Sequence, residues 1–255
     1  MTSSRSHHRV VPHAAVLAFG LTLAAAPLAQ AQQGGRGFLF RAPQVSFSFR
    51  AGYDHAMAGS DLFNFVTTEH TVSKSDFSSM VYAGDLGLAI SPRAELLVGF
   101  AYSKTKTPSE FRHWVDNNDQ PIQQTVSFER RPITGSIKVY VTPRGSMIGH
   151  FAWVPAHYAL YLGAGGGGIH YDFRQDGDFI DFNTLRVFPD HFRSSGTTPE
   201  AHAFGGTDVT LARNLSMTAE LRYTWAKATL GADYLGFDKL DLSGLAATGG
   251  LSLRF

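Results

Sequence analysis

The stretch Leu251-Ser252-Leu253-Arg254-Phe255 ends the chain and alternates apolar with polar side chains. Successive side chains of a β-strand point to opposite faces, so Leu251, Leu253 and Phe255 share one face while Arg254 lies on the other. This pattern predicts a final strand with one apolar and one polar face. The same two-residue period recurs along most of the preceding chain, whereas no long segment after the first 31 residues shows the 3.6-residue period of a helix.

The segments with this period predict eight β-strands. We expect them at residues 43–54, 80–90, 94–105, 125–142, 157–171, 200–211, 215–228 and 243–255. Pro132 lies inside the fourth segment and has no amide N–H for a strand ladder, so it predicts a bulge or a later start of that strand.

The connections between these segments alternate in length. Residues 91–93 and 212–214 are tight turns, and 143–156 is a longer apolar link expected to rest on a membrane interface. The other connections are predicted to be long polar loops, at residues 55–79, 106–124, 172–199 and 229–242. Short turns at one end and long loops at the other are typical of transmembrane barrels.

The first residues predict export. Arg5 and Arg9 precede an apolar stretch at 14–26, and Ala29-Gln30-Ala31 matches a cleavage site. We expect a signal peptide at 1–31, a periplasmic segment at 32–42 and one barrel domain at 43–255. The chain has no cysteine, which excludes disulfides and thiolate metal sites, and its net charge of +1 without a basic block argues against a nucleic-acid partner.

The polar faces of the predicted strands carry four acids and four bases. They are Arg50, Asp85, Glu95, Lys138, Asp208, Glu220, Arg222 and Arg254. A soluble lipocalin-like barrel would also alternate, but it would turn its apolar face inward. A balanced set of charges can instead pair inside a narrow barrel. The sequence therefore predicts an all-β fold, an eight-stranded antiparallel up-and-down transmembrane β-barrel whose lumen is filled by this charge network.

Several stretches resemble the outer-membrane β-barrel superfamily that includes the OmpA transmembrane domain, OmpW-like proteins and opacity-type surface antigens of the porin family. The resemblance spans residues 43–255 and is carried by 161–168, 204–209, 215–223 and 249–255. It implies an outer-membrane location with periplasmic termini, contact with outer-membrane lipids and lipopolysaccharide, and insertion by the barrel-assembly machinery. Leu251, Leu253 and Phe255 would form the C-terminal assembly signal, and no cofactor is implied.

Other candidate sites are weaker. The glycines of 163–168 lack the Lys-Ser/Thr of a phosphate loop and instead predict bends or close backbone approach. The aspartates of 172–190 lack the spacing of a calcium loop. His170, His191 and His202, with Ser194 and Ser195 nearby in sequence, match no hydrolase signature.

Aromatic residues predict two kinds of feature. Interface girdles are expected at Tyr53, Tyr102, Tyr171, Phe173, Tyr223 and Trp225 toward the loops, and at Phe151, Trp153 and Phe255 toward the periplasm. A site for apolar ligands is the alternative for Phe63, Phe65, Phe111 and Trp114.

The sequence favours a non-enzymatic barrel with a structural or surface-interaction role, exposing its loops to an extracellular partner. The alternative is an OmpW-like facilitator or small pore for small solutes, and a third hypothesis is a lipid A-modifying enzyme.

Overall fold

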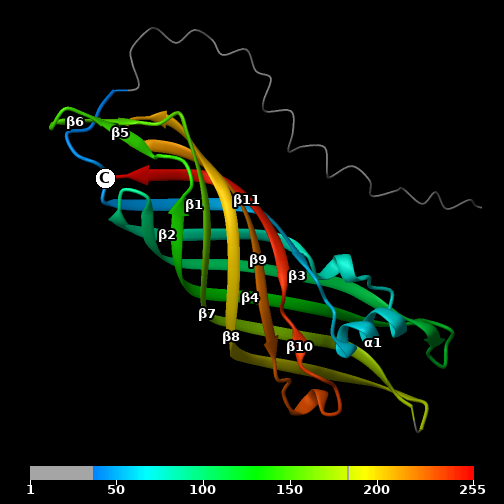
Figure 1. Cartoon of the computed structure of the whole chain (residues 1–255). Coiled ribbons are helices and arrows are strands. Elements are labelled where there is room, and N and C mark those ends of the chain that lie inside the picture. Colours follow the sequence, from blue (N-terminus) through cyan, green and yellow to red (C-terminus); the bar gives the residue numbers. More distant parts are fainter. Residues whose placement is uncertain (1–36, 183) are drawn as a thin grey trace, which may run out of the picture. The chain divides into compact units, whose positions relative to one another are not determined.

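The computed structural model describes residues 37–182 and 184–255, so the predicted signal peptide lies outside the described residues. Eight antiparallel strands form a closed ring in the order β9-β11-β1-β2-β3-β4-β7-β8, and β8 pairs back with β9 (Figure 1). Their bounds are β1 Val45–Ala56, β2 Ser79–Ser91, β3 Ala94–Val115, β4 Pro121–Tyr140, β7 Tyr158–Asp181, β8 Arg186–Ala212, β9 Leu215–Ala228 and β11 Gly244–Arg254. The predicted eight-stranded antiparallel barrel is confirmed.

Short elements lie at the two ends of this ring (Figure 1). At one end, close to the C-terminus, are β5 (Gly145–Ile148) and β6 (Ala152–Pro155), which form a hairpin. At the other end are α1 (Asp61–Glu69), two 3₁₀ turns at Lys74–Phe77 and Ala232–Tyr234, and the short strand β10 (Leu240–Asp241). Among the described residues, no helix is both long and apolar enough to cross a membrane.

The barrel has an inverted distribution of polarity. Large apolar side chains on the outward faces of the strands are exposed, for example Val98 at 64% and Ile133 at 63%. Charged side chains on the inward faces are buried, for example Asp208 at 1% and Glu95 at 2%. A continuous apolar band around a polar interior is the arrangement that a lipid bilayer stabilises. The strands therefore cross a membrane.

The prediction of long loops is wrong for two of the four segments. Residues 106–124 and 172–199 continue mostly as strand, so that the β3–β4 and β7–β8 hairpins project beyond the rest of the ring (Figure 1). β7 and β8 stay paired from Tyr158 with Val209 to Asp181 with Arg186. Above the membrane both faces of a strand can be polar, so the apolar alternation that reveals a strand in the sequence fades while the hydrogen-bond ladder continues.

The prediction of a bulge or late start at Pro132 is also wrong. β4 begins at Pro121, and the β3–β4 register is the same on both sides of Pro132, with Phe100 opposite Ile133 and Ser103 opposite Arg130. Between those two pairs, however, Ala101 and Tyr102 are not paired with β4. The wall keeps its register but has a local gap at the proline, as expected where an amide donor is missing.

Close backbone approach explains several wall glycines. A Cβ added at Gly250 would lie 1.9 Å from the carbonyl oxygen of Phe49, and one at Gly165 would lie 2.3 Å from that of Gly135. β7 keeps an unshifted register through its glycine run, so the glycines mark close packing and not bulges.

The segment between β1 and β2 folds back into the mouth of the barrel. Leu62, Phe63 and Val66 share the buried face of α1, as the spacing i, i+1, i+4 requires. The Phe63 ring lies 4.6 Å from that of Phe77 and 5.5 Å from that of Phe128, centroid to centroid. We call this buried cluster the apolar plug; it includes Ala56, Ala58, Leu62, Phe63, Val66, Val72, Phe77, Val126, Phe128, Ile169, Tyr171, Phe173, Ala226, Ala228, Tyr234, Leu240 and Leu242.

Candidate functional site

The lumen below the apolar plug is occupied by charged and aromatic side chains in successive layers. Nearest the β5–β6 hairpin, Asp208 accepts hydrogen bonds from Lys138 at 3.1 Å, from Arg254 at 2.7 Å and from the Tyr140 hydroxyl at 3.0 Å. Glu95 in the same layer is ion-paired with Arg144. Every charge in this layer has a partner of opposite sign, which offsets the cost of removing it from water.

A second layer is centred on Glu220. Arg50 forms ion pairs with both Glu220 and Asp85, and Arg222 Nε donates to Glu220 at 3.1 Å. The Tyr161 hydroxyl also donates to Glu220, at 3.2 Å. The structure thus brings all eight residues of the predicted charge set into the lumen, in two linked groups.

Other charged residues of the lumen are absent from that prediction, namely Arg144, Arg130, Asp54 and Glu200. Arg144 belongs to the layer near the hairpin, and Arg130 pairs with Asp54 at 2.7 Å closer to the apolar plug. Arg130 and Asp54 occupy inward-facing positions of β4 and β1. The alternation along each strand could therefore have identified them. Arg144 lies outside a predicted strand, and no parity signal marks it.

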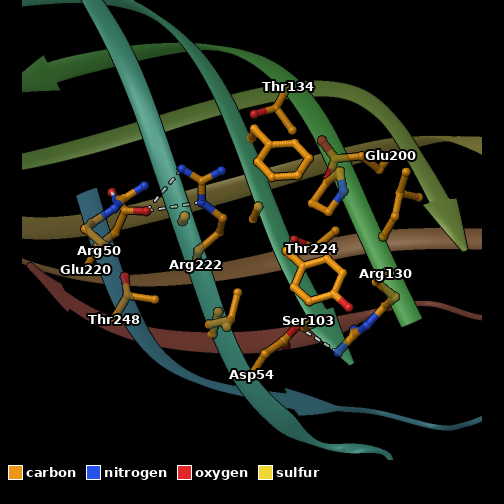
Figure 2. A pocket seen from close by; sticks show the side chains of 18 of the residues that line it. Arg50, Asp54, Ser103, Arg130, Thr134, Glu200, Glu220, Arg222, Thr224 and Thr248 are labelled. Atoms are coloured by element: carbon orange, nitrogen blue, oxygen red, sulfur yellow. Dashed lines mark hydrogen bonds and ion pairs between the residues drawn. The ribbon is translucent and has the colours of Figure 1, made fainter. Parts of the chain in front are cut away.

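A small cavity separates the Glu220 layer from the Arg130 layer. Figure 2 shows Arg50, Glu220 and Arg222 gathered on one side of it, and Asp54 with Arg130 on the other. Its volume is about 60 Å³. A buried water needs ~10–15 Å³, so the cavity has room for a few waters.

One hydrogen-bonded chain in the lumen has the order of a serine-hydrolase triad. Ser136 Oγ lies 2.8 Å from His202 Nε2, and His202 Nδ1 lies 2.9 Å from Glu200 Oε1. The cavity is lined by Glu200 but not by Ser136, and Ser136 is paired with Leu97 and with Gly165 in the sheet. A nucleophile needs space for a carbonyl and free donors for its oxyanion. We therefore interpret the chain as a satisfied buried polar network.

The remaining predicted histidine and serine residues are dispersed. His170 contacts Thr197, His191 contacts Asp176, and Ser194 shares a hydrogen bond with Tyr171. Within residues 37–182 and 184–255, no group of three or more His, Asp or Glu side chains is placed to hold a metal ion.

The wall gap at Pro132 opens toward the cavity. Phe100, Ala101, Tyr102 and Pro132 are among its lining residues, together with the charged residues of the lumen. Phe100 and Tyr102 belong to the outward face of β3, so the cavity reaches the wall at the point where the β3–β4 pairing is interrupted.

The predicted aromatic sites are rearranged. Phe63 lies in the centre of the apolar plug, and so do Tyr171 and Phe173, which therefore do not belong to an interface girdle. Phe65 and Phe111 line a groove of about 200 Å³ that borders the plug, together with His70 and with the plug residues Leu62 and Tyr234. Trp153 is buried at the β5–β6 end, whereas Phe151 and Phe255 are exposed there.

His70 is the unusual polar residue of this groove. Its side chain is buried, Nδ1 donates to the carbonyl oxygen of Val66 at 3.1 Å, and Nε2 has no hydrogen-bond partner. Burial, assisted by the charge of Arg112, lowers the pKa of His70 to about 4 despite the hydrogen bond to Val66. The imidazole is therefore neutral at physiological pH.

No family model and no curated protein matches the chain. Among solved structures, it is similar to neisserial surface protein A (12% identity, TM-score 0.46, covering 84% of this chain and 99% of that chain). It is also similar to the outer membrane protein OprG of Pseudomonas aeruginosa (12%, 0.49, 87% and 99%) and to Ail, the attachment invasion locus protein of Yersinia pestis (12%, 0.42, 83% and 99%). These neighbours are outer-membrane β-barrel proteins, the class that the sequence resemblance indicated.

Proposed function

We propose that this protein is a non-enzymatic outer-membrane anchor whose plugged barrel carries a raised rim of strands for interactions at the cell surface. The observation that carries the proposal is the double closure of the lumen. The charge layers fill its lower part, the apolar plug fills its mouth, and the cavity between them has a volume of only about 60 Å³. A path for solutes through the barrel would need both closures to move.

The projecting hairpins support a surface role. β3–β4 and β7–β8 extend the wall beyond the mouth (Figure 1). Their side chains there include exposed charges. Strands hold a binding surface more rigidly than a flexible loop does. In this proposal the termini lie in the periplasm, and Leu251, Leu253 and Phe255 present an exposed apolar edge to the barrel-assembly machinery during insertion.

Conductance of the purified protein in planar bilayers tests the closed lumen. We expect no reproducible channel steps from the wild type. A truncation that replaces residues 57–78 by a short glycine-serine linker removes α1 and leaves the charge layers, so it should also remain closed. Stable wild-type channels would contradict the proposal.

A facilitator for small apolar solutes is the second candidate, because the central cavity meets the wall gap at Pro132. Pro132→Val restores an amide donor at the gap. If the gap is a lateral exit, this variant should reduce uptake of a small aromatic solute by cells, while Ile133→Val, a neighbouring outward-facing change, should not. Equal uptake by cells with and without the protein would eliminate the facilitator.

A further inference from the structure

The outward face of β3, β4, β7 and β8 changes abruptly from apolar to charged. Phe100 and Ile133 are opposite each other and exposed. The next outward position on β4 is Arg131, followed along β3 by Lys104 opposite Glu129. Two residues of strand advance about 7 Å. Charged groups therefore begin one step above the apolar band, at the depth where lipid headgroups lie.

Register places these charges in rows that run across the strands. One row joins Lys104, Glu129 and Asp172. The row above it joins Lys106 and Ser127 to Arg174 and Arg193, which are directly opposite each other. We call this surface the charged lattice; it consists of Lys104, Lys106, Glu129, Arg131, Asp172, Arg174 and Arg193.

Each carboxylate of the charged lattice is shared by two cations. Glu129 pairs with Lys104 at 3.0 Å and with Arg131 at 2.9 Å. Asp172 pairs with Arg193 at 2.7 Å and accepts from Arg174 Nε at 2.7 Å. Positive charge is thus in excess, even with Asp176 at the edge.

The basic side chains retain free donors. Lys104, Arg131, Arg174 and Arg193 keep 43% to 54% of their side-chain surface exposed. Arginines directly opposite each other repel, and Asp172, which pairs with both Arg174 and Arg193, offsets this repulsion. Burial acts to raise the pKa of Asp172, but hydrogen bonds from Arg174 and Arg193 outweigh it and lower the value to about 2. Asp172 therefore stays ionised at physiological pH.

A cleft of about 150 Å³ lies within this surface. It is lined by Lys104, Lys106, Ser127, Glu129, Asp172 and Arg174, with Asp176 at its edge. Three cations and three carboxylates line the cleft, and Lys104 is paired with Glu129. Lys106 is exposed and forms no ion pair with these carboxylates, so Lys106 and the half-exposed guanidinium of Arg174 can donate charge-assisted hydrogen bonds to a phosphate.

We infer that the charged lattice binds the phosphate groups of the phosphorylated glycolipid of the outer leaflet, lipopolysaccharide, beside the barrel wall. The inference rests on the proposed outer-membrane location, because only lipid surrounding the barrel reaches an outward-facing site immediately above the apolar band. Lys106 and Arg174 would contact the phosphate in the cleft, and acyl chains would cover Phe100 and Ile133 below.

Binding of purified lipid A to the full-length protein in detergent micelles tests this inference. The lattice variant carries Lys106→Gln and Arg174→Gln. The matched control carries Lys74→Gln and Arg186→Gln, which remove the same charge from residues outside the lattice. We expect the lattice variant to bind lipid A about tenfold more weakly, equivalent to ~1.4 kcal/mol, and the control to bind like the wild type.

Lipid A stripped of its phosphates is the second arm, and it should bind all three proteins equally weakly. The inference is overturned if the folded lattice variant binds lipid A as well as the wild type, or if removing the phosphates does not weaken wild-type binding. Heat-dependent migration on gels verifies folding. Fractionation of cells tests the location separately: a wild type found outside the outer membrane overturns the proposed function, whatever the micelle result.

Discussion

Acidification should open the apolar plug, because His70 is buried as a neutral imidazole. Its pKa is lowered to about 4 in the folded protein, against 6.5 for the exposed group. The unfolded segment therefore binds more protons than the folded one between these values. The sign follows: the plug is fully stable above pH 6.5 and loses stability as the pH falls toward 4.

The two pKa values set the magnitude. At pH 5 the linkage relation gives a loss of about 2 kcal/mol in the free energy of plug opening. This loss raises the open population about thirtyfold. Opening of the plug here means release of residues 57–78, which include α1, from the ring strands. The segment after α1 is tied to β3 by main-chain hydrogen bonds such as Thr71 N–H to Glu110 C=O at 2.9 Å.

Hydrogen exchange measured by mass spectrometry on peptides from residues 57–78 is the assay, with rates corrected for the intrinsic effect of pH. We expect protection to fall about thirtyfold from pH 7.5 to pH 5 in the wild type. His70→Gln should abolish most of this dependence, and His191→Gln, whose side chain is 82% exposed, should not change it. The reasoning is refuted if His70→Gln keeps the wild-type pH dependence.

Three further predictions concern stability and assembly. Asp208→Asn removes the carboxylate that pairs with the buried cations Lys138 and Arg254. It should lower the free energy of unfolding, measured with urea in lipid vesicles, by about 3–5 kcal/mol. An unchanged urea midpoint would contradict a paired network. Phe63→Ala should destabilise the apolar plug by about 3–5 kcal/mol, seen as faster exchange of α1 without loss of exchange protection in the ring strands. Gly250→Ala should prevent assembly of the heat-modifiable barrel, whereas Gly135→Ala, with open space at its Cβ, should assemble normally.

The membrane-spanning part of the fold was predictable from the sequence because one physical constraint acts on every strand there. Lipid on one side and a polar lumen on the other impose the two-residue period. This constraint ends above the apolar band, where the sequence no longer predicts the strands. Residues 106–115 and 172–181 are strand, but water can solvate their outward side chains. Turn residues and polarity then give the appearance of a loop although the ladder continues.

Tyr171 and Phe173 show a different failure. Their position near the end of a predicted strand indicated an interface girdle, yet they share the parity of Tyr161 and Ile169, which face the lumen. Parity was the stronger signal because it is fixed by backbone geometry. By contrast, the contact of Ser136 with His202 joins strands that are not neighbours in the ring, and the position of such pairs depends on the stagger of the barrel, which local sequence does not encode.

The buried charges raise the question of why an anchor keeps them, since well-packed apolar residues stabilise an interior at least as well as ion pairs. Register offers a physical answer. Arg50 on β1 reaches Glu220 on β9 across β11, and Arg254 on β11 reaches Asp208 on β8 across β9, so these pairs form only when the last strand closes the ring. A slip of one residue in β11 would turn Arg254 toward lipid near the membrane interface, at a cost of about 0–1 kcal/mol, and would also remove one of the cations that pair with buried Asp208. Apolar lumen residues would carry no such penalty and would leave the closing register undetermined.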